Sequence, residues 1–237
     1  MRDEILNPLF SDISSIKGVG SKNLKLLTKL IDSSTIRDLI FHLPSNIIDR
    51  SYCPKLNEIQ TGRICTVKVK IIEHMAPKNK HQPYKVLVSD GTENLTLIFF
   101  KVYADSIAKN LPIGAFRYIS GKIEKFNNTL QMTHPDYIVS EQDVAKLPKF
   151  ETVYPLTAGI SNKMINNYIN QALGKTPNLP EWLDDEFIKK QNWLSFKEAI
   201  LDIHSPKYAY DLEPYSKSRS RLAYDELLAN QLALAIV

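Results

Sequence analysis

The sequence predicts an α+β protein in which a strand-rich middle segment lies between two helical segments. Apolar residues recur at helical spacing in the first segment, apolar and polar residues alternate in short stretches of the middle segment, and helix-capping signals return in the last segment. We therefore expect a helical region over residues 1–58, a strand domain over 59–145 and a helical region over 146–237.

The composition is that of an ordinary folded protein, with 237 residues and 43% hydrophobic content. No stretch approaches the ~20 consecutive apolar residues of a membrane helix. The first residues are charged, unlike a signal peptide, and Cys53 and Cys65 cannot build a disulfide framework. We expect a cytoplasmic protein with no membrane association.

The first segment is expected to contain a helical hairpin. Gly18 and Gly20 separate one helical pattern from a second one, and Thr35 opens a short helix that Pro44 ends. The glycines of such a hairpin let backbone N–H groups approach a phosphate at a helix N-terminus. Gly18, Gly20 and Lys22 are therefore candidate phosphate-binding residues, and a tight structural turn is the alternative interpretation.

The middle segment is expected to form an OB-fold, a five-stranded and partly open Greek-key β-barrel. The five predicted strands cover residues 66–71, 84–89, 95–100, 115–123 and 129–132. A helix is predicted within residues 101–112, between the third strand and the fourth.

The last segment is expected to be helical. Ser161 caps one helix, and Ser195 with Glu198 forms a capping box that opens another. A final helix starts near Ser218 and reaches Val237 without a stop signal. We expect the chain to be the front part of something longer.

Basic residues are concentrated in the middle segment. Residues 61–140 hold 11 Lys and Arg against 6 Asp and Glu, a balance of +5, whereas the whole chain has a net charge of +4. This asymmetry indicates a polyanionic partner, although solvated surface lysines give the same count.

Exposed aromatic rings are expected among these lysines. In the third strand the polar Thr96 assigns its row to the outer face, which displays Phe100 and buries Phe99. Phe100, Tyr103 and Phe126 are candidate platforms for nucleic-acid bases, and packing against the core or a neighbouring domain is the alternative. Candidate phosphate contacts are Lys68, Lys70, Lys78, Lys80, Lys85, Lys122 and Lys125.

Signatures of catalysis are absent from the sequence. The stretch from Gly114 to Gly121-Lys122-Ile123 has the wrong spacing for a phosphate-binding loop, and the five scattered histidines give no zinc spacing. We expect no catalytic residue and no metal site, so the chain by itself resembles a binding module.

Several ordered motifs resemble the N-terminal part of the RecG family of ATP-dependent DNA helicases. They span nearly the whole chain: Ile16-Lys17-Gly18-Val19-Gly20, Asp38-Leu39-Ile40-Phe41-His42-Leu43-Pro44, Asp49-Arg50, Val88-Ser89-Asp90-Gly91-Thr92, Phe99-Phe100, Ser120-Gly121-Lys122, Gln131-Met132-Thr133-His134-Pro135-Asp136-Tyr137, Val153-Tyr154-Pro155-Leu156-Thr157 and Arg221-Leu222-Ala223-Tyr224-Asp225-Glu226-Leu227-Leu228.

The resemblance implies that residues 59–145 are an OB-fold wedge domain, which splits DNA strands at a fork junction. Residues 146–237 would be a helical linker toward motor domains that this chain lacks. Implied partners are branched DNA (replication forks and four-way junctions) and those motor domains, in a protein expected to be a monomer. ATP and Mg²⁺ are implied for the motor domains alone, so the chain needs no cofactor and should not hydrolyse ATP.

The resemblance also implies a site. In the family, aromatics at the end of the third strand and just beyond it stack on unpaired bases at the branch point. Phe100, with Phe99 beside it, stands in that motif, and Tyr103 matches more loosely. The family usually has Asn after the paired aromatics, where this chain has Lys101.

Two other functions remain open from the residues. A protein-docking or structural role is favoured by the apolar stripe of Leu227, Leu228, Leu232 and Ile236. A single-stranded nucleic-acid-binding OB protein, including one that binds RNA, is a further alternative.

Overall fold

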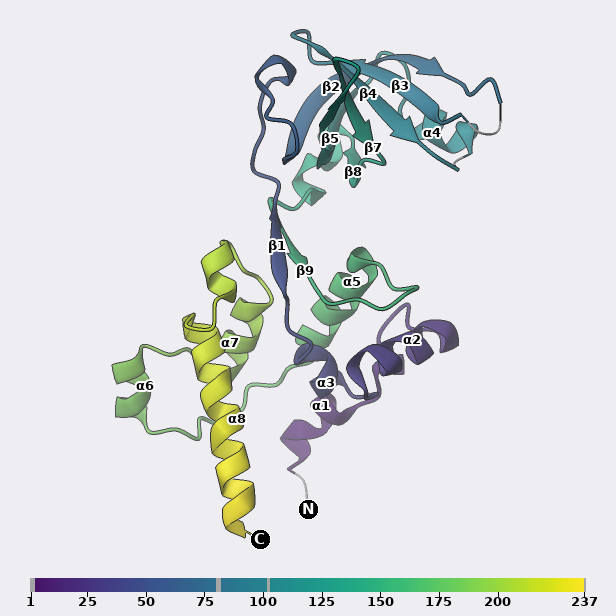
Figure 1. The fold of residues 1–237 in the computed structure, drawn as a ribbon. Coiled ribbons are helices and arrows are strands. Elements are labelled where there is room, and N and C mark those ends of the chain that lie inside the picture. Colours follow the sequence, from purple (N-terminus) through teal and green to yellow (C-terminus); the bar gives the residue numbers. More distant parts are fainter. Residues whose placement is uncertain (1–2, 80–81, 102, 237) are drawn as a thin grey trace. The chain divides into compact units, whose positions relative to one another are not determined.

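The computed structural model describes residues 3–79, 82–101 and 103–236. The chain divides into two compact units, one formed by residues 48–151 and the other by the residues up to Ile47 together with those from Thr152 onward (Figure 1). Strands β1 (Asn46–Asp49) and β9 (Phe150–Val153) pair as a separate two-stranded sheet where the chain passes from one unit to the other.

The unit of residues 48–151 is built on one seven-stranded sheet with the order β6-β7-β4-β3-β2-β5-β8. All neighbours are antiparallel except β4 and β7, which run parallel. Helix α4 (Ala104–Asn110) lies between β4 and β5 in the chain. The strands are β2 (Ile64–Met75), β3 (Tyr84–Ser89), β4 (Asn94–Phe99), β5 (Phe116–Lys122), β6 (Glu124–Phe126), β7 (Thr129–Thr133) and β8 (Tyr137–Val139).

The predicted fold class is confirmed, because β2, β3, β4, β5 and β7 correspond to the five expected strands and α4 to the expected helix. The sheet is partly open, as predicted, and it has two more strands than the five expected. Short strands β6 and β8 extend the sheet, and within the described residues no backbone pairing joins β5 to β7 to close it. The side chain of Met132 on β7 lies between these two strands and packs on Gly121 of β5. A Cβ added to Gly121 would lie 2.9 Å from the Met132 sulfur.

Alternation along the strands explains the core of this unit. Ile119 of β5 and Met132 of β7 are buried in the hydrophobic cluster of this unit. The other strands contribute inward residues that are almost fully buried: Val67, Val69 and Ile71 of β2, Val86 and Val88 of β3, and Leu95, Leu97 and Phe99 of β4. A bulge between Ile71 and Glu73 bends β2, as expected for a sheet that curls.

A buried arginine ties the edges of this unit together. Arg50 donates hydrogen bonds to Glu151, Asp136 and the Ser120 hydroxyl, and its guanidinium lies over the ring of Tyr137. A buried charge is tolerated only when it is paired in this way, so Arg50 fixes the start of the unit against its last residues.

The other unit is helical. Its helices are α1 (Asn7–Phe10), α2 (Ser21–Ile31), α3 (Ile36–Ile40), α5 (Asn162–Leu173), α6 (Asp185–Gln191), α7 (Phe196–Ile203) and α8 (Lys217–Ile236). Short 3₁₀ turns accompany the two units at Glu4–Leu6, Ile13–Ser15, Leu56–Glu58, Glu141–Lys146 and Ala209–Leu212. Among the described helices, none combines the length and apolar character needed to cross a membrane.

One hydrophobic core joins the first and last parts of the chain. Leu27, Ile36 and Leu39 from the first part are fully buried in the same cluster as Ile169 and Ile200 from the last. The residues up to Ile47 and those from Thr152 onward, which belong to segments expected as separate regions, therefore contribute to one unit. Helices of 4 to 11 residues before residue 48 have too little apolar surface to form a core alone.

The predicted caps are confirmed. Thr35 accepts a hydrogen bond from the Asp38 amide, Ser161 caps α5, and Ser195 with Glu198 forms a complete capping box at α7. These caps are local in sequence, which is why the residue pattern identifies them.

His204 is buried at the centre of the helical unit. Its Nε2 donates to the carbonyl of Ile40 at 2.7 Å, and its Nδ1 accepts from the Tyr154 hydroxyl at 2.9 Å. This pattern requires the neutral ring, and burial lowers the pKa of His204 to about 4.

We predict that this unit loses stability as the pH falls from 7 to 5. The unfolded chain binds a proton near the ordinary histidine pKa of about 6.5 and the folded chain only near 4, so stability rises with pH between these values. The free energy of unfolding should fall by about 2 kcal/mol over this interval. Urea unfolding followed by the fluorescence of Trp182 and Trp193, which lie in this unit, measures it.

The matched variant is His204→Gln. This variant removes the titrating group, so its free energy of unfolding should fall less between pH 7 and pH 5, whatever its stability at pH 7. Equal losses in the two proteins would contradict the assignment.

Candidate nucleic-acid interface

The end of β4 places two adjacent phenylalanines on opposite faces of the sheet. Phe99 is 5% exposed and packs in the core, whereas Phe100, the next residue, is 47% exposed. This confirms the register predicted from alternation. Ile98 of the outer row is also buried, between its cross-strand neighbours Lys85 and Thr133.

His134 holds the residues around Phe100 in place. Its backbone N–H donates to the carbonyl of Ile98 at 2.9 Å, and its Nε2 accepts a hydrogen bond from the Phe100 amide at 3.1 Å. Its ring lies 5.8 Å from the Phe100 ring and meets the Phe99 ring edge-on at 6.2 Å, centroid to centroid. Because Nε2 accepts, the ring proton of the neutral imidazole is on Nδ1.

Beyond Phe100 the chain turns sharply into α4. Lys101 has a φ of 52°, in the left-handed region that lysine rarely adopts and that Asn adopts more readily. Tyr103 is the N-cap residue of α4 and is 86% exposed. Two exposed rings therefore lie three residues apart in the chain at this end of the sheet.

The third candidate ring, Phe126, lies elsewhere on the same unit. It is 61% exposed at the end of β6, just before Asn127 and Asn128, whose φ values of 46° and 63° form the tight turn into β7. Phe126 is thus displayed at the tip of a hairpin, at the edge of the sheet.

Two of the candidate lysines are already paired with carboxylates. Lys68 lies 2.5 Å from Glu141 and 5.3 Å from the centre of the Phe116 ring, and the hydrogen bond with Glu141 raises the pKa of Lys68. Lys122 lies 3.1 Å from Glu124. A phosphate must compete with these carboxylates, so both lysines are weaker candidates than their charge suggests.

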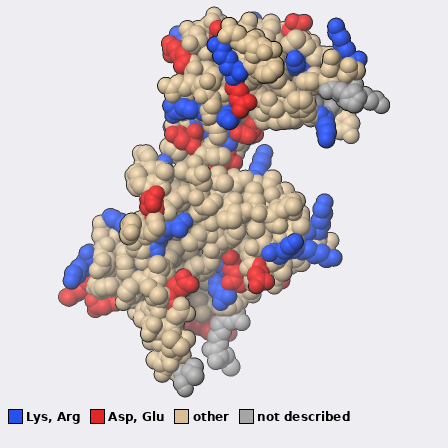
Figure 2. All heavy atoms as spheres, viewed as in Figure 1, with Lys and Arg blue, Asp and Glu red and all other residues tan. Residues whose placement is uncertain are grey.

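Four other candidates, Lys70, Lys78, Lys85 and Lys125, form no ion pair with any residue that the structure describes. Lys70 is on β2, Lys78 is in the loop after β2, Lys85 is on β3 and Lys125 is on β6. Lys80 lies outside the described residues. In the view of Figure 2, basic and acidic side chains are interspersed over this unit. The basic excess is therefore spread over several elements in this view.

The glycine hairpin of Gly18 and Gly20 lies in the helical unit, and Gly18 packs against other residues of that unit. The Gly18 carbonyl accepts hydrogen bonds from Tyr168 and Asn23, and Gly18 adopts a φ of 92° beside the Tyr168 ring. Gly20 caps α2, and Lys22 is exposed in the first turn of this helix. The geometry of Gly18 supports the interpretation as a structural turn, and phosphate contact by Gly20 and Lys22 stays a prediction.

Sequence reasoning did not assign His134 to the site. Its motif is part of the RecG resemblance, but the hydrogen bond to Phe100 joins residues 34 apart in the chain. The available signal was the sequence Thr133-His134-Pro135 directly after a strand, since a polar ring there can satisfy backbone groups at a strand end.

Comparison with known proteins decides the family. The family model described as "RecG wedge domain" matches residues 12–176. The chain belongs to the RecG wedge domain family.

Relatives of this wedge domain are longer proteins. ATP-dependent DNA helicase RecG of Thermotoga maritima is 31% identical over 95% of this chain, which covers 29% of that protein. RecG of Escherichia coli K12 is 27% identical over 94% of the chain, which covers 33% of it. The chain thus spans about a third of the curated relatives that it matches.

A solved structure resembles this RecG-family chain in fold as well. The structure described as RecG bound to a three-way DNA junction superposes with a TM-score of 0.77 at 29% identity, over 95% of this chain and 31% of the other.

We predict that His134→Ala exposes the Phe100 amide to solvent exchange. Loss of the Nε2 acceptor leaves this N–H without its protein partner, so its hydrogen exchange should accelerate, whereas the amide of Val88, inside the ladder of β3, should change little. Exchange measured amide by amide by NMR tests this, and an unchanged Phe100 amide would show that His134 does not hold it.

Proposed function

We propose that this chain binds branched DNA and separates strands at the branch point. The observation that carries the proposal is the exposed ring of Phe100 at the end of β4, in a chain that matches the RecG of a junction complex over 95% of its length. Phe100 and Tyr103 stack on bases that have lost their partners, and Lys70, Lys78, Lys85 and Lys125 contact phosphates.

Energetics favour a branched substrate over a linear one. Separating base pairs sacrifices about 1.4 kcal/mol per stacking step, and a base stacked on an aromatic side chain recovers about 1–3 kcal/mol. A linear duplex presents no unpaired base inside its length and gains phosphate contacts alone. Tighter binding to branched DNA than to linear duplex would therefore indicate that bases stack on the aromatic side chains.

Work on the DNA requires further parts of the protein. We propose that this wedge acts with ATPase motor domains of the same protein, which would bind ATP and Mg²⁺. Together they would remodel stalled replication forks and branched recombination intermediates by fork regression and branch migration, in the cytoplasm and as a monomer. The chain's coverage of only 29% and 33% of two RecG relatives supports this division of labour.

A second candidate function is protein docking through α8. Leu227, Leu232 and Ile236 are exposed on its later turns, together with Leu234. Apolar surface of this kind is typical of a contact with another protein part. The two functions are separable because counterion release makes DNA binding depend steeply on salt, whereas apolar docking does not.

We predict tighter binding to a three-way junction than to a linear duplex of equal length. Fluorescence anisotropy at fixed salt measures both dissociation constants. If the four unpaired lysines each contact a phosphate, the logarithm of the association constant should fall with the logarithm of salt concentration with a slope of about −3 to −4. Equal affinities would contradict the proposal, and a flat salt dependence would favour docking.

We predict that Phe100→Ala weakens junction binding by about 1–3 kcal/mol, the value of one stacked base. The matched control is Phe116→Ala on β5, because Phe116 is 45% exposed in the same unit and contacts Lys68. Duplex affinity should change little in both variants. An unchanged junction affinity for Phe100→Ala, or an equal loss in the control, would reduce Phe100 to a packing residue.

A further inference from the structure

Two segments that are far apart in the chain meet in the helical unit and carry no acidic residue. Residues 13–31 and 152–180 hold six lysines and no Asp, Glu or Arg, whereas the whole chain has a net charge of +4. The rest of the chain therefore has a net charge of −2. The six lysines are Lys17, Lys22, Lys25, Lys29, Lys163 and Lys175.

Hydrogen bonds join the two segments. The Gln171 side chain of α5 accepts from the backbone N–H of Lys17 at 3.0 Å and donates to the carbonyl of Lys17 at 3.2 Å. The Tyr168 hydroxyl donates to the Gly18 carbonyl at 3.1 Å and accepts from the Asn23 amide at 3.0 Å. The charges of both segments therefore belong to one part of the helical unit. We refer to residues 13–31 together with 152–180 as the α2–α5 surface.

Three of the lysines form a row on the exposed face of α2. Lys22, Lys25 and Lys29 are exposed and lie on one side of the helix, because they are three and four residues apart, and Leu27 on the opposite side is fully buried. The row rises about 10 Å along the helix axis. In the view of Figure 2, basic side chains gather at the right-hand edge of the helical unit, where Figure 1 places α2.

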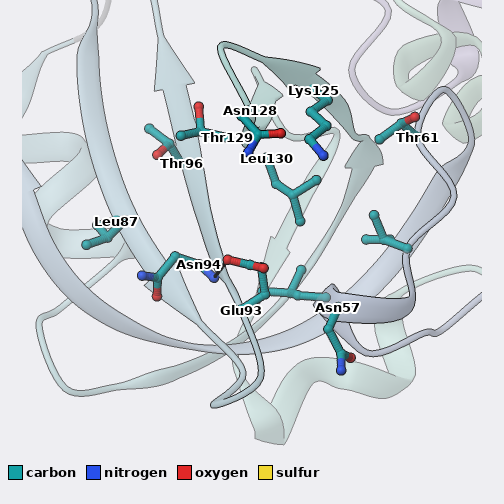
Figure 3. Close-up of a pocket in the computed structure, with 12 residues that line it drawn as sticks. Asn57, Thr61, Leu87, Glu93, Asn94, Thr96, Lys125, Asn128, Thr129 and Leu130 are labelled. Atoms are coloured by element: carbon teal, nitrogen blue, oxygen red, sulfur yellow. Dashed lines mark hydrogen bonds between the residues drawn. The ribbon is translucent and has the colours of Figure 1, made fainter.

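The lysines of this surface are available to a ligand. None of the six forms an ion pair with a residue in the ranges that the structure describes. One of them, Lys175, donates to the Ser15 hydroxyl at 2.7 Å. The OB-like unit differs, because Lys125 and Glu93 lie on different sides of the hollow in Figure 3 and offset each other's charge. A polyanion therefore meets more uncompensated charge on the α2–α5 surface than in that hollow.

The uncharged residues of the surface suit a sugar–phosphate backbone. Asn167 and Asn170 are exposed on α5, and amide side chains commonly donate to phosphates. The two aromatic residues of these segments, Tyr154 and Tyr168, are buried and offer no platform for an unpaired base. Three phosphate steps along one strand of a duplex advance about 10 Å, which matches the rise of the lysine row.

We propose that the α2–α5 surface binds the phosphate backbone of double-stranded DNA, with Lys22, Lys25 and Lys29 on successive phosphates of one strand. Binding is independent of sequence, because phosphates carry no sequence information directly. This inference rests on the proposed function, since it takes DNA to be the polyanion. It adds a site for paired DNA on the helical unit to the site for unpaired bases at Phe100.

The test removes the lysine row from the 237-residue chain in the triple variant Lys22→Gln, Lys25→Gln and Lys29→Gln. Anisotropy titrations with a linear duplex at several salt concentrations measure the affinity and its salt dependence. The loss of three phosphate contacts should make the logarithmic salt slope shallower by about 3 and weaken binding at low salt by at least about tenfold.

The matched control is the triple variant Lys189→Gln, Lys190→Gln and Lys207→Gln. These lysines are exposed in the same unit but lie outside the α2–α5 surface. The control removes the same charge, so it corrects for the change in net charge. It should keep the salt slope of the unaltered chain.

Lysine acetylation of the unaltered chain gives a second measurement that depends on no variant. The chain is treated with an acetylating ester with and without duplex, and the modified lysines are quantified by mass spectrometry. Duplex should slow the acetylation of Lys22, Lys25 and Lys29 and leave that of Lys189 and Lys190 nearly unchanged.

The outcomes separate this inference from the proposed function. If the row variant binds duplex like the control, or duplex protects both sets of lysines alike, the inference is overturned and the preference for junctions still tests the proposed function. Displacement of the duplex by poly-glutamate at an equal concentration of charge would assign the surface to an acidic protein and also overturn it. If the unaltered chain shows no preference for junctions while the row variant loses duplex affinity, the proposed function fails and the duplex site stands.

Discussion

The outward position of Phe100 depends on the parallel pairing of β4 with β7. Because the two strands run in the same direction, the residue after β7 meets the residues that end β4. His134 occupies that position and bonds Ile98 and Phe100 on either side of the buried Phe99. An exposed aromatic ring is normally free to fold back onto apolar surface, and here the backbone is held at Phe100 itself and at Ile98, two residues before it.

The same topology arranges the face that DNA would follow. Outer residues of β3, β4 and β7 lie side by side in successive rows, with Lys85, Ile98 and Thr133 in one row and Leu87, Thr96 and Gln131 in the next. Phe100 lies beyond the first row, directly after the last residue of β4. A single strand that follows these rows from Phe100 would meet the Lys85 cation and then the polar side chains of Thr96 and Gln131.

Charge counting overstates how many cations this face offers. The sequence shows lysines but not their partners, and the structure pairs Lys68 with Glu141 and Lys122 with Glu124. Exposed pairs of this kind are worth little in stability, yet each must be broken or shared when a phosphate approaches. The affinity for DNA should thus depend on fewer lysines than the +5 balance of residues 61–140 suggests.

Local patterns predicted local structure well. Alternation identified five of the seven sheet strands and the opposite faces of Phe99 and Phe100, and the caps at Thr35, Ser161 and Ser195 follow from residues within four positions of one another. Features that join distant segments were not predictable in this way. The contact of Met132 with Gly121, the hydrogen bond of His134 with Phe100, and the shared core of Ile36 and Ile169 each depend on the tertiary fold.

The central claim is that the Phe100 ring stacks on an unpaired base. The most direct measurement is the NMR chemical shift of the Phe100 ring protons during titration with a three-way junction. Stacking on a base should move these resonances through the ring current of the base, and a linear duplex should leave them nearly unchanged. Ring resonances that stay in place while the junction binds would contradict the account.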